Sequence, residues 1–174
     1  MKSSVYPDAT EDEIIEFLID SARSGDADDG RDVEQVLDDN AQFINCTNSR
    51  GHSMLHYAAA NGNINFLNLL LSDKYSDTLN RNIQNLEGNT ALHWAAMNNH
   101  KEAIITLLNA GCDCNIKNSM GNTPLGEIQD RDFEDVETLL VEKDKGLDEY
   151  IQQCQEESPN ADDNESSTDS DDSS

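Results

Sequence analysis

Three copies of one short motif recur along the chain, and this repetition constrains the fold more than any other feature. The sequence GHSMLHYAA at 51–59 returns as GNTALHWAA at 88–96, and GNTPLGEI at 121–128 is a shortened third copy. The leading glycines are 37 and then 33 residues apart. A period of this length is typical of stacked helical units, none of which can bury its apolar face alone.

The residue types inside the motif predict where each helix begins. Each copy opens with a glycine, which suits a tight turn with positive φ. A serine or threonine follows two positions later and is a natural helix N-cap, while Pro124 suits the first helical position because no N–H is needed there. The alanine pairs at 58–59 and 95–96 are small enough for neighbouring helices to lie close together. The predicted N-caps are Ser53, Thr90 and Thr123.

The second copy and the segment after it resemble the ankyrin-repeat family. TALHWA at 90–95 differs at one position from the T-P-L-H-x-A motif of that family, and 109–115 resembles its G-A-D-V-N ending with cysteines at two positions. The resemblance implies an all-α ankyrin-repeat solenoid of about four helix-turn-helix units, with degenerate terminal caps and a disordered acidic C-terminal tail. It also implies a concave face of finger-like turns and first helices, on which protein partners dock.

The repeat pattern divides the chain into predicted segments. Residues 26–32 form an acidic insertion, after which the second helix of the first unit is expected from Val33. The long connection at 72–84 is either an enlarged finger loop or a disordered segment. The complete assignment is a flexible N-terminus at 1–9, an ankyrin-repeat domain at 10–146 with units at about 10–44, 48–84, 85–117 and 118–146, a short helix at 147–155, and a disordered acidic tail at 156–174.

The chain is strongly acidic, with 36 Asp and Glu against 11 Lys and Arg and a formal net charge of −25. Direct nucleic-acid binding needs basic side chains that neutralise phosphates, and anionic membrane surfaces attract basic segments, so neither partner is expected. The charge favours a basic protein partner. The N-terminal residues lack the apolar core of a secretory leader, which favours a cytoplasmic and nuclear location, and we expect a monomer.

No combination of side chains indicates catalysis, so the chain is not expected to be an enzyme. His56 and His93 occupy the repeated histidine position, where each ring is expected to bind backbone and brace neighbouring units, whereas His52 is expected in solvent. Cys112 and Cys114 are expected to pack as small apolar side chains, with a metal or redox role as the alternative. Because a second pair of ligands is missing, no metal and no cofactor are expected.

The predicted partner-binding surface lies on the concave face. In the three copies, the position after the repeated histidine holds Tyr57, Trp94 and Glu127 in turn. The surface is therefore expected to change from aromatic to acidic along the stack. Aromatic rings are favoured anchors at protein interfaces. Two alternatives are open. The aromatic pair covers neighbouring helices instead, or the acidic cluster near the C-terminal cap is a solvated face, its members being Asp130, Asp132, Glu134, Asp135 and Glu137. The other residues assigned to this surface are Arg50, His52, Glu87, Asn89, Met97, Met120, Asn122, Asp130, Asp132 and Glu134.

A narrower resemblance is to the fungal acidic ankyrin-repeat chaperones of the KH-domain small-subunit ribosomal protein. It rests on the small size, the GNTALHWAA copy, the DVET segment at 135–138 and the acidic tail. This resemblance implies a chaperone that shields basic segments of a newly made ribosomal protein, with binding that weakens as salt screens the charges. The alternative is a signalling or transcriptional adaptor that binds a folded regulatory protein. In the tail, Ser158, Ser166 and Thr168 match kinase-site patterns, and phosphorylation there would deepen the charge.

Overall fold

The computed structural model describes residues 8–24 and 29–143. These residues form helices joined by turns, and within them the bridge between Thr47 and Ser53 is the only β pairing. A last helix at 134–143 ends the described part of the chain. The other elements are α1 (Glu11–Ser24), α2 (Asp29–Asp39), η1 (Ala41–Asn45), α3 (Met54–Ala60), α4 (Ile64–Leu70), η2 (Asp73–Tyr75), α5 (Ala91–Met97), α6 (Lys101–Asn109) and η3 (Gly126–Ile128), where η denotes a 3₁₀ turn.

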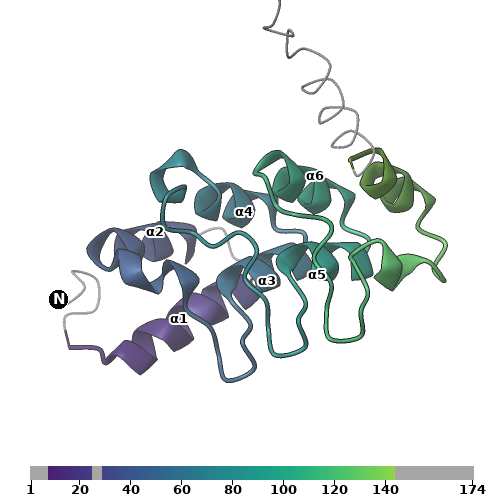
Figure 1. Ribbon diagram of the computed structural model, residues 1–174. Coiled ribbons are helices and arrows are strands. Elements are labelled where there is room, and N and C mark those ends of the chain that lie inside the picture. The colour runs from purple at the N-terminus through teal and green to yellow at the C-terminus, as the bar shows by residue number, and fades with distance from the viewer. Residues whose placement is uncertain (1–7, 25–28, 144–174) are drawn as a thin grey trace, which may run out of the picture.

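The helices stand in two layers, as Figure 1 shows. Helices α1, α3 and α5 lie side by side in the first layer, and α2, α4 and α6 form the second. The turns that precede α3, α5 and η3 project as fingers beyond the first layer (Figure 1). The predicted all-α solenoid of stacked helix pairs is therefore confirmed.

The apolar core lies between the two layers and between successive units. Leu18, Leu55 and Leu92 of the first layer are buried, and so are Leu67 and Ile104 of the second. Each helix presents one apolar stripe to this core, as a helical period of about 3.6 residues requires. The alanine pairs pack as predicted, because these small side chains are fully buried between neighbouring helices: Ala58, Ala59, Ala95 and Ala96.

The repeated histidines join each unit to the next. The Nδ1 atom of His56 accepts a hydrogen bond from the backbone N–H of Ser53 at 3.2 Å, and Nε2 donates to the carbonyl oxygen of Asn89 at 2.8 Å. His93 makes the same pair of bonds one unit further on, both at 3.1 Å. Since a backbone N–H only donates and a carbonyl only accepts, both rings are neutral with the proton on Nε2. The predicted bracing role of the two histidines is confirmed.

Two of the three predicted N-caps begin an α-helix. Ser53 precedes α3 and Thr90 precedes α5, whereas Thr123 caps a turn in which its Oγ1 accepts from the N–H of Gly126 at 3.2 Å. Only the 3₁₀ turn η3 follows, so the prediction that Pro124 occupies the first position of an α-helix is wrong. The cause is Gly126, which replaces the bracing histidine and is a poor helix former.

The second helix of the first unit begins earlier than predicted. Helix α2 starts at Asp29, inside the acidic insertion, rather than at Val33. Its Val33, Val36 and Leu37 are fully buried against the core, so the insertion extends a helix that is already anchored.

The long connection at 72–84 is an ordered loop that packs against the second layer. It contains η2, and its Tyr75 and Leu79 are buried. The ammonium group of Lys74 pairs with the carboxylates of Glu34, at 3.0 Å, and Asp38 on α2. The segment is therefore an ordered loop, but it packs against α2 in the second layer, so the prediction of an enlarged finger is wrong.

Several sequence predictions fall outside the described residues. These are most of the N-terminal segment at 1–9, the short helix at 147–155, the acidic tail at 156–174, and the three phosphorylation sites Ser158, Ser166 and Thr168.

Candidate protein-binding surface

Four rings form an aromatic cluster at the base of the first two fingers: His52, His56, Tyr57 and Trp94. The ring centroid of Trp94 lies 4.6 Å from that of His52, 5.4 Å from His56 and 5.7 Å from Tyr57, all in edge-to-face orientations. Tyr57 comes from α3 and Trp94 from α5, so the cluster links two units. Both rings are half-buried: they cover neighbouring helices and still keep exposed surface for a partner.

His52 is an interior member of this cluster, so the prediction that it is solvated is wrong. The residue is 9% exposed because the indole of Trp94, from the following unit, packs against it. Burial lowers the pKa of His52, an effect that the Glu87 carboxylate opposes and the Arg50 guanidinium reinforces. The neutral ring is within hydrogen-bond distance of the Tyr57 hydroxyl, with Nδ1 at 3.2 Å. His52 therefore supports the cluster from within.

An asparagine at the base of each finger fixes its backbone. The Oδ1 atoms of Asn48, Asn85 and Asn118 each accept two backbone N–H bonds, from the residues two and four positions on, at 2.9 to 3.1 Å. Successive fingers are also joined directly, because Leu86 N–H donates to the Arg50 carbonyl at 3.1 Å. Ser119 N–H donates to Glu87 at 2.9 Å in the same way. The fingers thus form one hydrogen-bonded ladder.

The side-chain amides of these asparagines differ in their partners. Asn48 Nδ2 donates to the Tyr57 hydroxyl at 3.0 Å, and in the last unit the amide donates to Glu127. Asn85 Nδ2 has no partner among the residues described, although Asn85 is only 6% exposed. Trp94 holds the position that Tyr57 and Glu127 fill elsewhere, and an indole offers no acceptor. At the second finger the amide of Asn85 is therefore a buried donor without a partner, which lowers the stability of the fold.

The finger residues assigned to the surface from sequence do not all face outward. Arg50, Glu87 and Met120 are exposed, Met120 to 81%. Leu86, which the sequence analysis missed, is 75% exposed and adds an apolar side chain to the second finger. Asn89 is buried instead, because its Oδ1 accepts from the amide of the following finger at 2.9 Å. The prediction that Asn89 contacts a partner is thus not supported by its position.

The acidic end of the surface contains one held carboxylate and several free ones. Glu127 accepts from the amides of Asn118 and Asn122, the latter at 3.2 Å, so its carboxylate is fixed between fingers and half-buried. Three further predicted carboxylates are exposed and have no ion-pair partner within residues 8–24 and 29–143: Asp130, Asp132 and Glu134.

A hollow between the aromatic cluster and this acidic end has an arginine in its lining. Its lining includes Ala60, Trp94, Met97 and Arg131. The Nη1 atom of Arg131 donates to the Met97 carbonyl at 2.7 Å, and the guanidinium lies 5.9 Å from the centroid of the Phe133 ring. No carboxylate of the described residues lies within ion-pair distance of this guanidinium. Arg131 was not predicted from the sequence, and its guanidinium places positive charge beside Met97.

A groove at the opposite end of the surface was also missed. It runs between α1 and the first finger, and we call it the α1 groove. The α1 side chains stand at positions 12, 16 and 20, one helical turn apart, with Ile15 and Ile19 between them. The finger contributes Asn48, and Tyr57 of the aromatic cluster lies at the same wall. The full lining is Asp12, Ile15, Glu16, Ile19, Asp20, Arg23, Thr47, Asn48, Ser49 and Tyr57.

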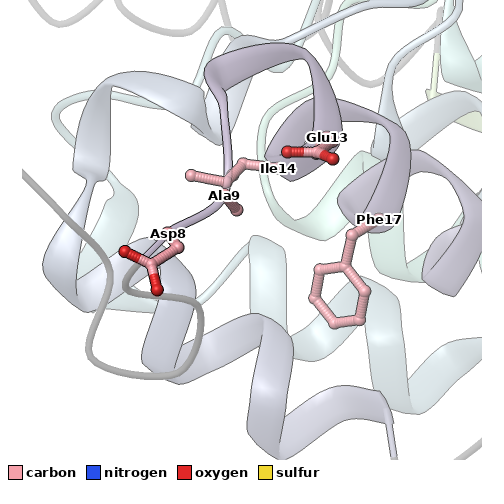
Figure 2. Close-up of a pocket in the computed structure, with 5 residues that line it drawn as sticks. All are labelled: Asp8, Ala9, Glu13, Ile14 and Phe17. Atoms are coloured by element: carbon pink, nitrogen blue, oxygen red, sulfur yellow. The ribbon is translucent and has the colours of Figure 1, made fainter.

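A different hollow lies on another side of α1, and Figure 2 shows its five lining residues. Asp8 and Ala9 precede the helix, and Glu13, Ile14 and Phe17 project from it. The carboxylate of Glu13 is occupied as a helix cap, because it accepts from the Thr10 N–H at 2.8 Å and from the Thr10 hydroxyl at 2.9 Å. These bonds lower the pKa of Glu13. The hollow therefore belongs to the start of α1, and its acid already has a structural role.

Metal binding, membrane insertion and cysteine chemistry can each be checked against the described residues. They contain no group of three metal-ligating side chains and no helix that is long and apolar enough to cross a membrane. Cys112 packs as a small apolar side chain, as predicted, and burial raises the pKa of its thiol to about 12. Cys114 is half-buried against the same core.

Comparison with known protein families decides the classification. A model described as ankyrin repeat matches residues 50–85, and a model described as ankyrin repeats (3 copies) matches residues 77–153. The chain belongs to the ankyrin-repeat family. Ankyrin repeats are a protein–protein interaction module and are generally non-enzymatic, so the chain contains a module of the kind that binds proteins. The fingers and first-layer helices described above form the face that such repeats offer to partners.

Proposed function

We propose that this ankyrin-repeat protein is a non-enzymatic chaperone that shields basic segments of a newly made KH-domain small-subunit ribosomal protein before ribosome assembly. The observation that carries the proposal is the composition of the concave surface. Two half-exposed aromatic rings, Tyr57 and Trp94, stand between two groups of exposed carboxylates, one on α1 and one beyond η3. Aromatic anchors with flanking acid suit a client rich in Lys and Arg.

The charge of the whole chain supports the same class of client. At −25 it attracts basic proteins and repels RNA, so a ribosomal segment bound here is kept from unspecific RNA contacts. The sequence resemblance to fungal ribosomal-protein chaperones supplies the specific client. Because ribosomal proteins are synthesised in the cytoplasm, we propose that the complex forms there and that the chaperone accompanies its client into the nucleus.

A solubility assay tests the proposal directly. A KH-domain small-subunit ribosomal protein is diluted to low ionic strength, and aggregation is followed by light scattering with and without an equimolar amount of the full chain. Suppression of aggregation that is lost at high salt is expected, because screening weakens contacts between exposed charges. Trp94→Ala is expected to reduce client affinity about tenfold or more, as loss of a central aromatic anchor does. Ile105→Ala on α6, an exposed apolar side chain in the second layer, is the matched control and leaves affinity unchanged.

Affinity capture from native lysate, with and without RNase, distinguishes the two candidate functions. Recovery of one basic ribosomal protein that resists RNase supports the chaperone. Recovery of kinases or transcription factors without a ribosomal protein would support the adaptor instead and reject the chaperone.

A further inference from the structure

We infer that the α1 groove is the seat for a Lys- and Arg-rich segment of the protein partner, and that the acidic end beyond η3 is not. The inference rests on the proposed binding of a basic protein. It departs from the sequence-based assignment, which placed Asp130, Asp132 and Glu134, but no residue of α1, on the partner-binding surface.

The shape of the groove supports this assignment. Its walls come from two elements, with α1 on one side and residues 47–49 of the first finger on the other. Ile15 and Tyr57 are half-buried between them, so the lining combines apolar surface with charge. A basic side chain can pack its methylene stem on such apolar surface while its charged end reaches a carboxylate.

The carboxylates of the groove are available. Asp12 and Glu16 are exposed, and neither has an ion-pair partner among the described residues. The one cation in the lining, Arg23, is paired with Asp20 at 2.8 Å and so is largely neutralised. Positions 12 and 16 are about 6 Å apart along the helix axis, a spacing that successive basic side chains of a bound segment can match.

The opposite end is less suited to a basic segment. Arg131, which lies between Asp130 and Asp132 in the sequence, lines the hollow beside Trp94. Its guanidinium donates to the Met97 carbonyl and has no carboxylate partner among the described residues. That positive charge repels an approaching Lys or Arg. Lys101 further neutralises this end, since its ammonium group pairs with Asp135 at 3.1 Å.

The groove is also continuous with the aromatic cluster. Tyr57 belongs to both, and its hydroxyl is fixed by Asn48, which lines the groove as well. A ring held in one orientation next to carboxylates is a favourable site for a guanidinium, because the ring face attracts cations. A segment seated in the groove can therefore extend over Tyr57 to the exposed part of Trp94.

A peptide titration with the full chain tests the inference. The probe is a fluorescein-labelled peptide in which Lys and Arg alternate with Leu, and a peptide with Glu at the basic positions is the negative probe. Binding is measured by fluorescence anisotropy. We expect Asp12→Lys/Glu16→Lys to weaken binding of the basic peptide at least about tenfold, as reversal of two contacting charges does.

Two other variants serve as controls. Asp77→Lys/Glu102→Lys makes the same change in net charge at exposed positions away from the groove, and Glu102, like Asp12, is the second residue of its helix. Asp130→Lys/Asp132→Lys makes the same change at the acidic end. Both are expected to alter affinity less than about threefold, since distant exposed charges are screened. The milder Asp12→Asn/Glu16→Gln variant preserves the test if the lysines impair folding.

The outcomes separate this inference from the proposed function. If the unmodified chain does not prefer the basic peptide over the acidic one, the proposed function fails. If the unmodified chain binds the basic peptide but the groove variants bind equally well, or if the Asp130 variant is the more damaging, the chaperone proposal stands and the α1 groove is rejected as the seat.

Discussion

The imidazole of His56 donates from Nε2 to the backbone carbonyl of Asn89, at 2.8 Å and across 33 residues of sequence. This bond joins one unit to the finger of the next, and the ring also accepts from Ser53 at the start of its own helix. One fully buried side chain therefore connects local helix capping to the stacking of repeats. The same arrangement recurs at His93.

Replacement of His56 by leucine tests the contribution of these bonds. Leucine has a similar volume but no polar atoms, so the Ser53 N–H and the Asn89 carbonyl lose their partner without a large cavity. We expect the free energy of unfolding in urea to fall by about 2–4 kcal/mol, because each buried group left unpaired costs about 1–3 kcal/mol. A fall of under about 0.5 kcal/mol would show that the histidine bracket does not stabilise the stack.

The same histidine predicts a pH dependence of stability. Burial is the main cause that lowers the pKa of His56 to about 4, from 6.5 in an unfolded chain. Below pH 6.5 the His56 side chain becomes protonated in the unfolded chain, whereas in the folded chain it stays neutral down to about pH 4. The free energy of unfolding therefore decreases as the pH falls through this window. At its limit the loss attributable to His56 is about 3 kcal/mol.

Urea unfolding at pH 7.5 and pH 5 measures this effect, with His56→Leu as the control. Carboxylates titrate in part of the same window in both proteins, so the difference between their pH slopes isolates the histidine. The unmodified chain should lose more stability than the variant over this interval. Equal slopes would contradict the lowered pKa of His56.

The sequence predicted those parts of the fold that depend on local residue types. The Ser or Thr cap, the bracing histidine and the alanine pair occur within a few positions of one another, so α3 and α5 could be placed from the motif alone. The third copy was misjudged at Pro124 because the loss of the histidine at Gly126 weakens the helix more than the proline favours its start.

The candidate site could be predicted only in part, because its surface depends on how units sit against each other. Trp94, which belongs to the neighbouring unit, packs against His52 and buries it. Asn89 is buried because it accepts a hydrogen bond from the Asn118 amide of the next finger. The α1 groove needs the first finger beside Glu16, and Arg131 reaches Met97 across 34 residues. None of these relationships is encoded in the spacing of a single repeat.

Because adjacent fingers lie close together, we expect alanine to be tolerated differently at two finger glycines, Gly88 and Gly121. Gly88 has a φ of 76°, and a Cβ atom there would lie 2.8 Å from the backbone nitrogen of Ser119 and 3.0 Å from the Cα of Asn118. Gly121 has a φ of 86°, but its Cβ would meet nothing within 4 Å. Gly121→Ala is expected to cost about 1 kcal/mol from positive φ alone.

Gly88→Ala should cost about 1–3 kcal/mol more than Gly121→Ala, because the finger ladder must separate where the new methyl group meets backbone. Thermal or urea unfolding of the two variants compares them directly. Equal destabilisation would show that adjacent fingers yield easily, and it would argue against a rigid ladder behind the binding surface.

The amide of Asn85 has no hydrogen-bond partner among the described residues, so a residue that offers an acceptor at position 94 is expected to stabilise the fold. At the first finger Asn48 Nδ2 donates to the Tyr57 hydroxyl at 3.0 Å, but at the second finger Trp94 stands at the tyrosine position and offers no acceptor. Trp94→Tyr supplies a hydroxyl at the equivalent place, while Trp94→Phe supplies the same ring without it. We expect the tyrosine variant to exceed the phenylalanine variant in unfolding free energy by about 1 kcal/mol, the net value of one hydrogen bond.

Urea unfolding of this matched pair isolates the hydroxyl, since both variants lose the same indole contacts with His52 and Tyr57. If the two variants are equally stable, the Asn85 amide is not short of a partner, and Trp94 imposes no cost at this position. If tyrosine is more stable than both phenylalanine and the unmodified chain, the indole occupies a position where tyrosine would stabilise the fold better. Weaker client binding by the same tyrosine variant would then indicate that Trp94 serves recognition, because the added hydrogen bond would favour the fold while the lost indole surface removed part of the anchor.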